Sequence, residues 1–303
     1  MKAIFLKLTA TFLALLLILS MTGCDNLDYR EAVELYNDQN YKAAAEIFYA
    51  LDDYEDSAEL YTRCQYWMAV ELMEKGLYQE ALPRFLKLGD YEDSAQRAVE
   101  CKYQRAIAAF DDGNLRDAEN LFLDAPDYKQ TPEYLRRITW QKFFAEVSAV
   151  GTLQLEEAGK VYSISADPET ARLVFFTSDT KDMDYRFYDD LTLTLTRDST
   201  EAAFTATSTF TMGFKGSQIG SAQTGSGVVD ISTITADTVL SLNTYEKTST
   251  DNLGKTSTTT DPAESLMSGD MAENFSALMS VIPTLLADSG ISLTLQDIGF
   301  ATI

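Results

Sequence analysis

Small and aromatic residues recur along the first half of the chain with a period of 37 residues. The recurring sets are Ala32, Ala69 and Ala106, then Ala44, Ala81 and Ala118, then Phe48, Phe85 and Phe122, then Tyr54, Tyr91 and Tyr128. They define three copies, over about 28–65, 65–102 and 102–138, and each copy predicts a longer helix and a shorter one. Gly76 and Gly113 mark the break between the two helices. A repeat of this length predicts stacked helical pairs that bury their apolar faces against one another.

A hexapeptide, DYEDSA, joins the copies. It occurs at residues 53–58 and 90–95, and the related DYKQTP occupies 127–132. Asp56 and Asp93 stand three residues before Glu59 and Gln96, which is the spacing of a helix-capping box. We therefore predict a helix start at each hexapeptide, with the cap at the aspartate or at the serine that follows it, rather than an acidic binding site.

The second copy contains AVELMEKGLYQEALPRF, which resembles the tetratricopeptide repeat (TPR) in its placement of Ala69, Leu72, Gly76, Tyr78, Ala81 and Phe85. The resemblance covers about 28–138. It departs from the family in its period, 37 residues against about 34, and in the closing proline that the first two copies lack. The resemblance implies an α-helical TPR-like solenoid, whose inner helices line a groove for a protein or peptide partner.

A second apolar stripe on the longer helices is the candidate partner surface. Its members recur at i, i+4 and i+7 in each copy, more than a helix packed on one side needs. They are Tyr29, Val33, Tyr36, Tyr66, Val70, Met73, Tyr103, Ile107 and Phe110. The alternative is that these side chains pack between helices or against the next domain.

Two cysteines also recur at the repeat spacing, Cys64 and Cys101. Equivalent positions on stacked helices lie about 10 Å apart, beyond the reach of a disulfide. We expect two buried free thiols.

From residue 139 onward the pattern changes. A helix continues to about 150, and period-two alternation then predicts strands near 152–156, 160–166, 172–177, 191–196, 204–214, 227–234 and 238–247. The residues near 252–254 form either a hairpin or a linker, and a helix is expected at about 264–287, with a kink or restart at Pro283. The predicted fold class is α+β and multidomain: the TPR-like solenoid over 24–138, then a curved antiparallel β-sheet with a packed C-terminal helix over 139–303. No family resemblance is evident for this second half.

The N-terminus has the pattern of an export signal. Lys2 and Lys7 precede an uncharged stretch that ends at Cys24. The ending MTGC resembles the bacterial lipobox, which implies a signal peptide over 1–23 and acyl chains such as palmitate on Cys24. The expected location is the extracytoplasmic face of the bacterial cell membrane, held by the lipid. The alternative is an uncleaved signal anchor.

Charge and composition limit the kinds of partner, catalytic site and cofactor that the chain can have. The 47 acidic and 24 basic residues give a formal charge of −23, which disfavours a nucleic-acid partner. The chain has no histidine, so catalytic triads that use histidine and His-ligated zinc are excluded. The glycines between 213 and 227 fit no nucleotide-binding motif and read as hairpin loops, and no cofactor is predicted.

An acidic cluster between residues 179 and 190 is the remaining candidate site in the second half. It comprises Asp179, Asp182, Asp184, Asp189 and Asp190. It lacks the glycine and the terminal glutamate of an EF-hand, so surface acids are favoured over calcium ligands. Ser178 and Lys181 match S-x-x-K but lack that motif's companions.

The leading hypothesis is a non-enzymatic, lipid-anchored envelope protein that acts as an interaction scaffold through its repeats. The first alternative is a lipoprotein that binds a small molecule or lipid between the sheet and its helix. The second is a hydrolase that uses two carboxylates.

Overall fold

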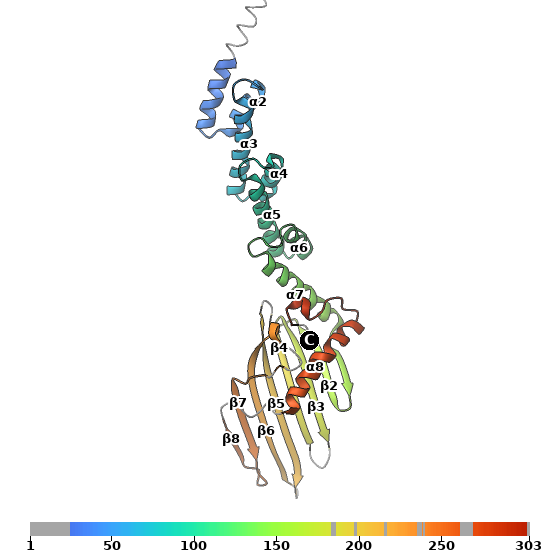
Figure 1. Cartoon of the computed structure of the whole chain (residues 1–303). Helices are drawn as coiled ribbons and strands as arrows, with labels where there is room; N and C mark the ends of the chain where they lie inside the picture. Colours follow the sequence, from blue (N-terminus) through green and yellow to red (C-terminus); the bar gives the residue numbers. More distant parts are fainter. Residues whose placement is uncertain are drawn as a thin grey trace, which may run out of the picture. The chain divides into compact units, whose positions relative to one another are not determined.

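The computed structural model describes residues 25–182, 186–196, 199–214, 217–234, 238, 240–260 and 269–301. The chain divides into two compact units, Met1–Thr131 and Pro132–Ile303, here called the helical unit and the sheet unit. A helical N-terminal half followed by an antiparallel sheet confirms the α+β class (Figure 1). The expected signal peptide and Cys24 lie outside the described residues.

The helical unit consists of paired helices of unequal length. A helix over 25–37 is followed by α2 (Tyr41–Leu51), α3 (Ser57–Glu74), α4 (Tyr78–Leu88), α5 (Ser94–Asp111) and α6 (Leu115–Leu123). Gly76 and Gly113 take φ values of 73° and 76° between the longer and shorter helices. A residue without Cβ adopts this left-handed conformation at little cost, which explains the glycine at both turns.

The predicted helix starts at 57 and 94 are confirmed, but the capping box is wrong. Asp56 and Asp93 occupy the N-cap positions, and neither carboxylate makes a side-chain capping hydrogen bond. Each carboxylate instead accepts a hydrogen bond from a tyrosine of the preceding longer helix. Ser57 and Ser94 are buried behind them.

The sheet unit begins with α7 (Thr131–Val150) and continues as a meander of eight antiparallel strands in sequence order. The strands are β1 (Leu153–Glu157), β2 (Lys160–Asp167), β3 (Arg172–Asp182), β4 (Arg186–Thr196), β5 (Glu201–Phe214), β6 (Ser217–Asp230), β7 (Thr244–Thr250) and β8 (Thr256–Thr259). The last helix, α8 (Gly269–Asp288), lies across one face of the sheet and contacts β1 to β4 (Figure 1). The core of this unit includes Trp140, Phe143 and Val147 of α7. The boundary between the units therefore lies after Thr131, whereas the sequence pattern predicted it after residue 138.

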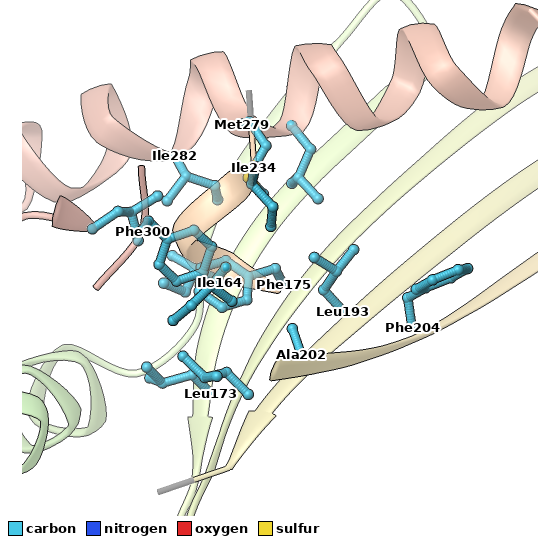
Figure 2. Packing of buried hydrophobic residues seen from close by; sticks show 14 of the residues in the cluster. Ile164, Leu173, Phe175, Leu193, Ala202, Phe204, Ile234, Met279, Ile282 and Phe300 are labelled. Atoms are coloured by element: carbon cyan, nitrogen blue, oxygen red, sulfur yellow. The ribbon is translucent and has the colours of Figure 1, made fainter. Parts of the chain in front are cut away.

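Apolar side chains fill the space between α8 and the sheet. Met279 and Ile282 of α8 point toward Phe175 and Leu193 of the strands (Figure 2). These four side chains are completely buried. A ligand between sheet and helix would have to displace this core, so the packing gives no support to the small-molecule alternative.

Close packing leaves no room for a side chain at one glycine of β6, Gly227. A Cβ on Gly227 would lie 2.5 Å from the carbonyl oxygen of Ser241 and 2.6 Å from the Phe204 ring. Gly220, Gly225 and Gly227 lie inside β6 and Gly213 lies inside β5, so their prediction as loop residues is wrong. Gly216 lies outside the described residues. Strand β6 runs on because antiparallel pairing with β5 extends over its whole length.

The structure answers two questions that the sequence left open on the C-terminal side. Residues 251–255 form the turn of the β7–β8 hairpin, which decides between the hairpin and the linker. The last helix continues through Pro283 as one element rather than restarting there.

None of the helices in the described part of the chain combines the length and the apolar character that a membrane span requires.

Candidate functional site

The first tyrosine of each repeat lies at the centre of a three-ring cluster. The ring centroid of Tyr66 is 6.3 Å from that of Phe85 and 5.8 Å from that of Tyr91, both in edge-to-face geometry. The same cluster recurs as Tyr29, Phe48 and Tyr54 and as Tyr103, Phe122 and Tyr128. Such ring pairs each contribute about 0.5–1.5 kcal/mol beyond their buried area. The hexapeptide tyrosines are thus packing residues.

Hydroxyl groups of these tyrosines bind the start of the next longer helix. Tyr66 Oη donates to Oδ1 of Asp93 at 2.6 Å, and Tyr29 Oη donates to Oδ1 of Asp56 at 2.5 Å. Arg97 Nε also donates to Oδ1 of Asp93, at 2.7 Å. The Arg97 hydrogen bond lowers the pKa of Asp93, and the hydrogen bond to Asp56 raises the pKa of Tyr29 to about 12.

The third copy makes a comparable link with other residues. Tyr128 Oη donates to Oε2 of Glu100 at 2.5 Å, and Lys129 pairs with the same oxygen. Burial would raise the pKa of Glu100, but the hydrogen bonds from Lys129, Tyr128 and Gln104 hold it below its usual value. Gln130 occupies the position that corresponds to Asp93.

The structure does not present the predicted partner stripe as an exposed surface. Tyr66, Val70 and Tyr103 are only 5–7 % exposed. The other six members, Tyr29, Val33, Tyr36, Met73, Ile107 and Phe110, are half-buried. Packing between helices, the alternative to a partner surface, describes Tyr29, Tyr66 and Tyr103, because these three tyrosines are the centres of the ring clusters.

A different surface of the helical unit is hollowed. The first inter-repeat groove has a volume of about 220 Å³ and lies between the start of α2, the C-terminal half of α3 and Arg84 of α4. Its lining residues are Gln39, Asn40, Tyr41, Lys42, Met68, Glu71, Leu72 and Arg84. None of them belongs to the predicted stripe.

The second inter-repeat groove has a volume of about 510 Å³ and repeats the first one along the chain. Every lining residue of the first groove, moved on by 37 positions, is a lining residue of the second. The corresponding residues are Gly76, Leu77, Tyr78, Gln79, Arg105, Ala108, Ala109 and Leu121. The groove is therefore a property of the repeat rather than of one local irregularity.

A third hollow, the tyrosine pocket, adjoins the first groove. It has a volume of about 320 Å³ and shares Lys42, Met68 and Arg84 with that groove. Tyr49 and Tyr61 line it, with ring centroids 5.5 Å apart, and the Tyr49 side chain is 72 % exposed. The two hollows thus adjoin along these three side chains, and together we call them one depression with basic and aromatic walls.

One feature of the sequence marks these grooves, namely the variation between copies at the positions that border them. The repeat-invariant positions, such as Ala69 and Phe85, are buried and hold the helices together. Seven of the eight equivalent positions that border the two grooves differ between copies, among them Met68 and Arg105, and only Tyr41 and Tyr78 are the same. Because these groove-lining positions vary while the buried residues stay the same, each copy can contact a partner in its own way.

The acidic cluster of the sheet unit is partly brought together. Asp179 and Asp189 are paired across β3 and β4, and each is 4 % exposed. Lys160 Nζ lies 3.6 Å from Asp179 Oδ2 and donates to Oδ1 of the buried Asn274 at 3.3 Å. These two aspartates are not surface acids, because the β3–β4 register turns them to the face that α8 covers.

The other members of the cluster do not join the buried pair. Asp190 lies on the opposite face of β4, since side chains alternate along a strand. The Asp182 side chain and Asp184 lie outside the described residues. The buried pair is closed to a substrate in solvent, so its geometry gives no support to carboxylate-dependent hydrolysis.

Within the described residues, no three or more Cys, Asp or Glu side chains are arranged to hold a metal ion. Ser178 and Lys181 lie in β3 rather than at the start of a helix. No family model, curated protein or solved structure matches the chain.

Proposed function

We propose that this chain is a lipid-anchored protein of the bacterial envelope whose helical unit is a TPR-like scaffold for another protein. The acyl chains on Cys24 would hold it at the extracytoplasmic face of the membrane. No nucleic acid, cofactor or catalytic step is part of the proposal.

One observation carries it: the inter-repeat groove that recurs at the 37-residue spacing. Side chains inside the repeats are packed, as the completely buried Phe48, Phe85 and Phe122 illustrate. The hollows occur where one helical pair meets the next, so stacking creates them without any loss of core. A surface made in this way extends along the repeats and suits an elongated partner.

The binding surface differs from the one the TPR resemblance implies. That resemblance places a partner on the inner, longer helices. The grooves use the shorter helices as well, through Lys42 of α2 and Arg84 of α4, together with Met68 of α3. We therefore place the partner at the grooves rather than on the stripe through Tyr29, Tyr66 and Tyr103.

Site-specific photo-crosslinking in living cells tests the scaffold. A photoreactive amino acid replaces Met68 in the first groove or Ala108 in the second, and Leu86 serves as the control position. Leu86 is 58 % exposed on α4 and lines none of the three hollows. The expected result is one discrete adduct of the same partner from Met68 and Ala108, and none from Leu86. Equal labelling at all three positions, or no adduct, would overturn the scaffold.

Membrane attachment is tested separately. A Cys24→Ser chain should leave the membrane fraction and lose incorporation of a palmitate analogue. A variant that stays membrane-bound would show that attachment does not depend on the lipidated cysteine.

A further inference from the structure

The basic side chains of the helical unit fall into two groups. Residues 25–131 contain 24 acidic and 11 basic residues, so a basic side chain there has many possible partners. Five basic residues form ion pairs within the described part of this unit: Arg63, Lys75, Arg97, Lys102 and Lys129. Lys42 and Arg84, the two basic residues that line the first groove, form no side-chain hydrogen bond or ion pair with any described residue.

Lys42 and Arg84 stand where the first groove and the tyrosine pocket meet. Both residues line both hollows, so their charges face the same depression. The carboxylate of Glu71, also in the groove, lies 3.7 Å from Lys75 Nζ. The depression therefore offers two uncommitted positive charges in a unit that is otherwise strongly acidic. An occupant with one or two carboxylates would complement them.

The other lining residues indicate which further side chains a bound ligand needs. Met68 and Leu72 supply apolar surface, and the rings of Tyr49 and Tyr61 flank the pocket. Glu46 also lines the pocket and would repel a long run of negative charge. Polyphosphate and nucleic acid are disfavoured by this carboxylate and by the acidic unit around it.

We infer that the first groove and the tyrosine pocket bind an acidic peptide segment of the partner, with Asp or Glu side chains at Lys42 and Arg84 and an adjacent apolar or aromatic side chain in the tyrosine pocket. This inference rests on the proposed scaffold function and specifies the chemistry of its partner. The contacts are partly exposed, so the charges contribute selectivity and association rate more than large affinity.

The test begins with random dodecapeptides displayed on phage and selected on the purified full-length chain. Selected peptides should be rich in Asp and Glu next to aromatic or aliphatic residues. Their synthetic forms should bind about tenfold more weakly to the Lys42→Glu/Arg84→Glu variant, and more weakly to the unaltered chain at high salt.

The matched control is Lys87→Glu/Arg116→Glu, which changes the net charge by the same amount. Lys87 and Arg116 are exposed, unpaired among the described residues and outside the three hollows. This control should bind the selected peptides as the unaltered chain does. The Lys42→Glu/Arg84→Glu variant should keep its circular dichroism spectrum, since neither residue supports the fold, and a new selection on it should yield basic peptides.

Three results would overturn the inference. Selected peptides could lack acidic residues, or bind both variants equally, or be displaced by inorganic polyphosphate of the same total charge as readily as by the unlabelled peptide. The proposed scaffold function is tested separately, by the crosslinked adducts at Met68 and Ala108. Adducts without acidic-peptide binding would refute this inference alone, and the absence of both would refute the scaffold as well.

Discussion

The hydroxyl of Tyr66 donates a hydrogen bond of 2.6 Å to the carboxylate of Asp93, which lies 27 residues later in the chain. Tyr29 and Asp56 have the same separation and the same contact. Each bond joins one longer helix to the first residues of the next longer helix. The aspartate of each hexapeptide thus connects two helices, and Asp93 also pairs with Arg97 of its own helix.

Replacing Tyr66 by phenylalanine should weaken this joint without disturbing the ring cluster. The expected loss in the free energy of unfolding of the helical unit is about 1 kcal/mol, the usual net value of one such hydrogen bond. Urea unfolding followed by far-ultraviolet circular dichroism measures it. Tyr49→Phe is the control, because Tyr49 is 72 % exposed. Equal losses in the two variants would show that the Tyr66 hydroxyl has no special role.

The Asp93→Asn substitution should destabilise the helical unit at pH 7 and much less at pH 3. The Arg97 hydrogen bond lowers the pKa of Asp93 in the folded chain, with Tyr66 acting in the same direction. The stabilisation is therefore present above the unfolded pKa of about 3.9 and is lost as the pH falls through the lower folded value. Urea midpoints of both chains between pH 7 and pH 3 should converge. A constant difference would contradict the assignment.

The two cysteine thiols of the helical unit should resist modification in the folded chain. Cys64 and Cys101 are free and buried, and burial raises the pKa of each thiol to about 11. Few thiolates exist at pH 8, and the reagent cannot reach them. An aromatic disulfide reagent should label both only after urea is added. Rapid labelling of the native chain at pH 8 would show that the repeats open locally.

Two phenylalanine substitutions should act on different units. Phe143 of α7 and Phe85 of α4 are both completely buried. Phe143→Ala should destabilise the sheet unit and Phe85→Ala the helical unit, each by about 3–5 kcal/mol. Hydrogen exchange resolved by residue should show faster exchange in β1–β4 for the first and in α3–α5 for the second. The reverse result would place α7 with the repeats.

The sequence predicts the elements of this chain better than their contacts. Period-three-to-four and period-two patterns are local, and they located α3, α5 and most strands because packing in each unit follows those periods. Which unit α7 joins depends on the surfaces that Trp140 and Phe143 meet, and no local pattern records that. The predicted partner stripe has the expected spacing, but its pattern does not record that the rings of Tyr66 and Tyr103 pack between helices.

Side-chain direction in the sheet was harder to predict for a physical reason. Asp179 and Asp189 are buried together only because the β3–β4 register pairs them. A shift of one residue would move either side chain to the opposite face, and composition alone does not fix that register. The grooves escaped prediction in the same way, because they exist only once neighbouring copies are stacked.

The sheet acquires its cover last. Strands β1–β4 end by residue 196, whereas α8 and the residues around Ile298 and Phe300, which cover their apolar face, come more than 70 residues later. During synthesis from the N-terminus, the helical repeats are complete before α8 is made. Phe175 and Leu193 therefore remain exposed until α8 packs on the sheet. A product that stops before residue 269 would retain the eight described strands and expose this apolar face, which favours aggregation. Burial of the sheet therefore depends on α8, and a truncated product would differ from the folded chain by an exposed apolar surface on β1–β4.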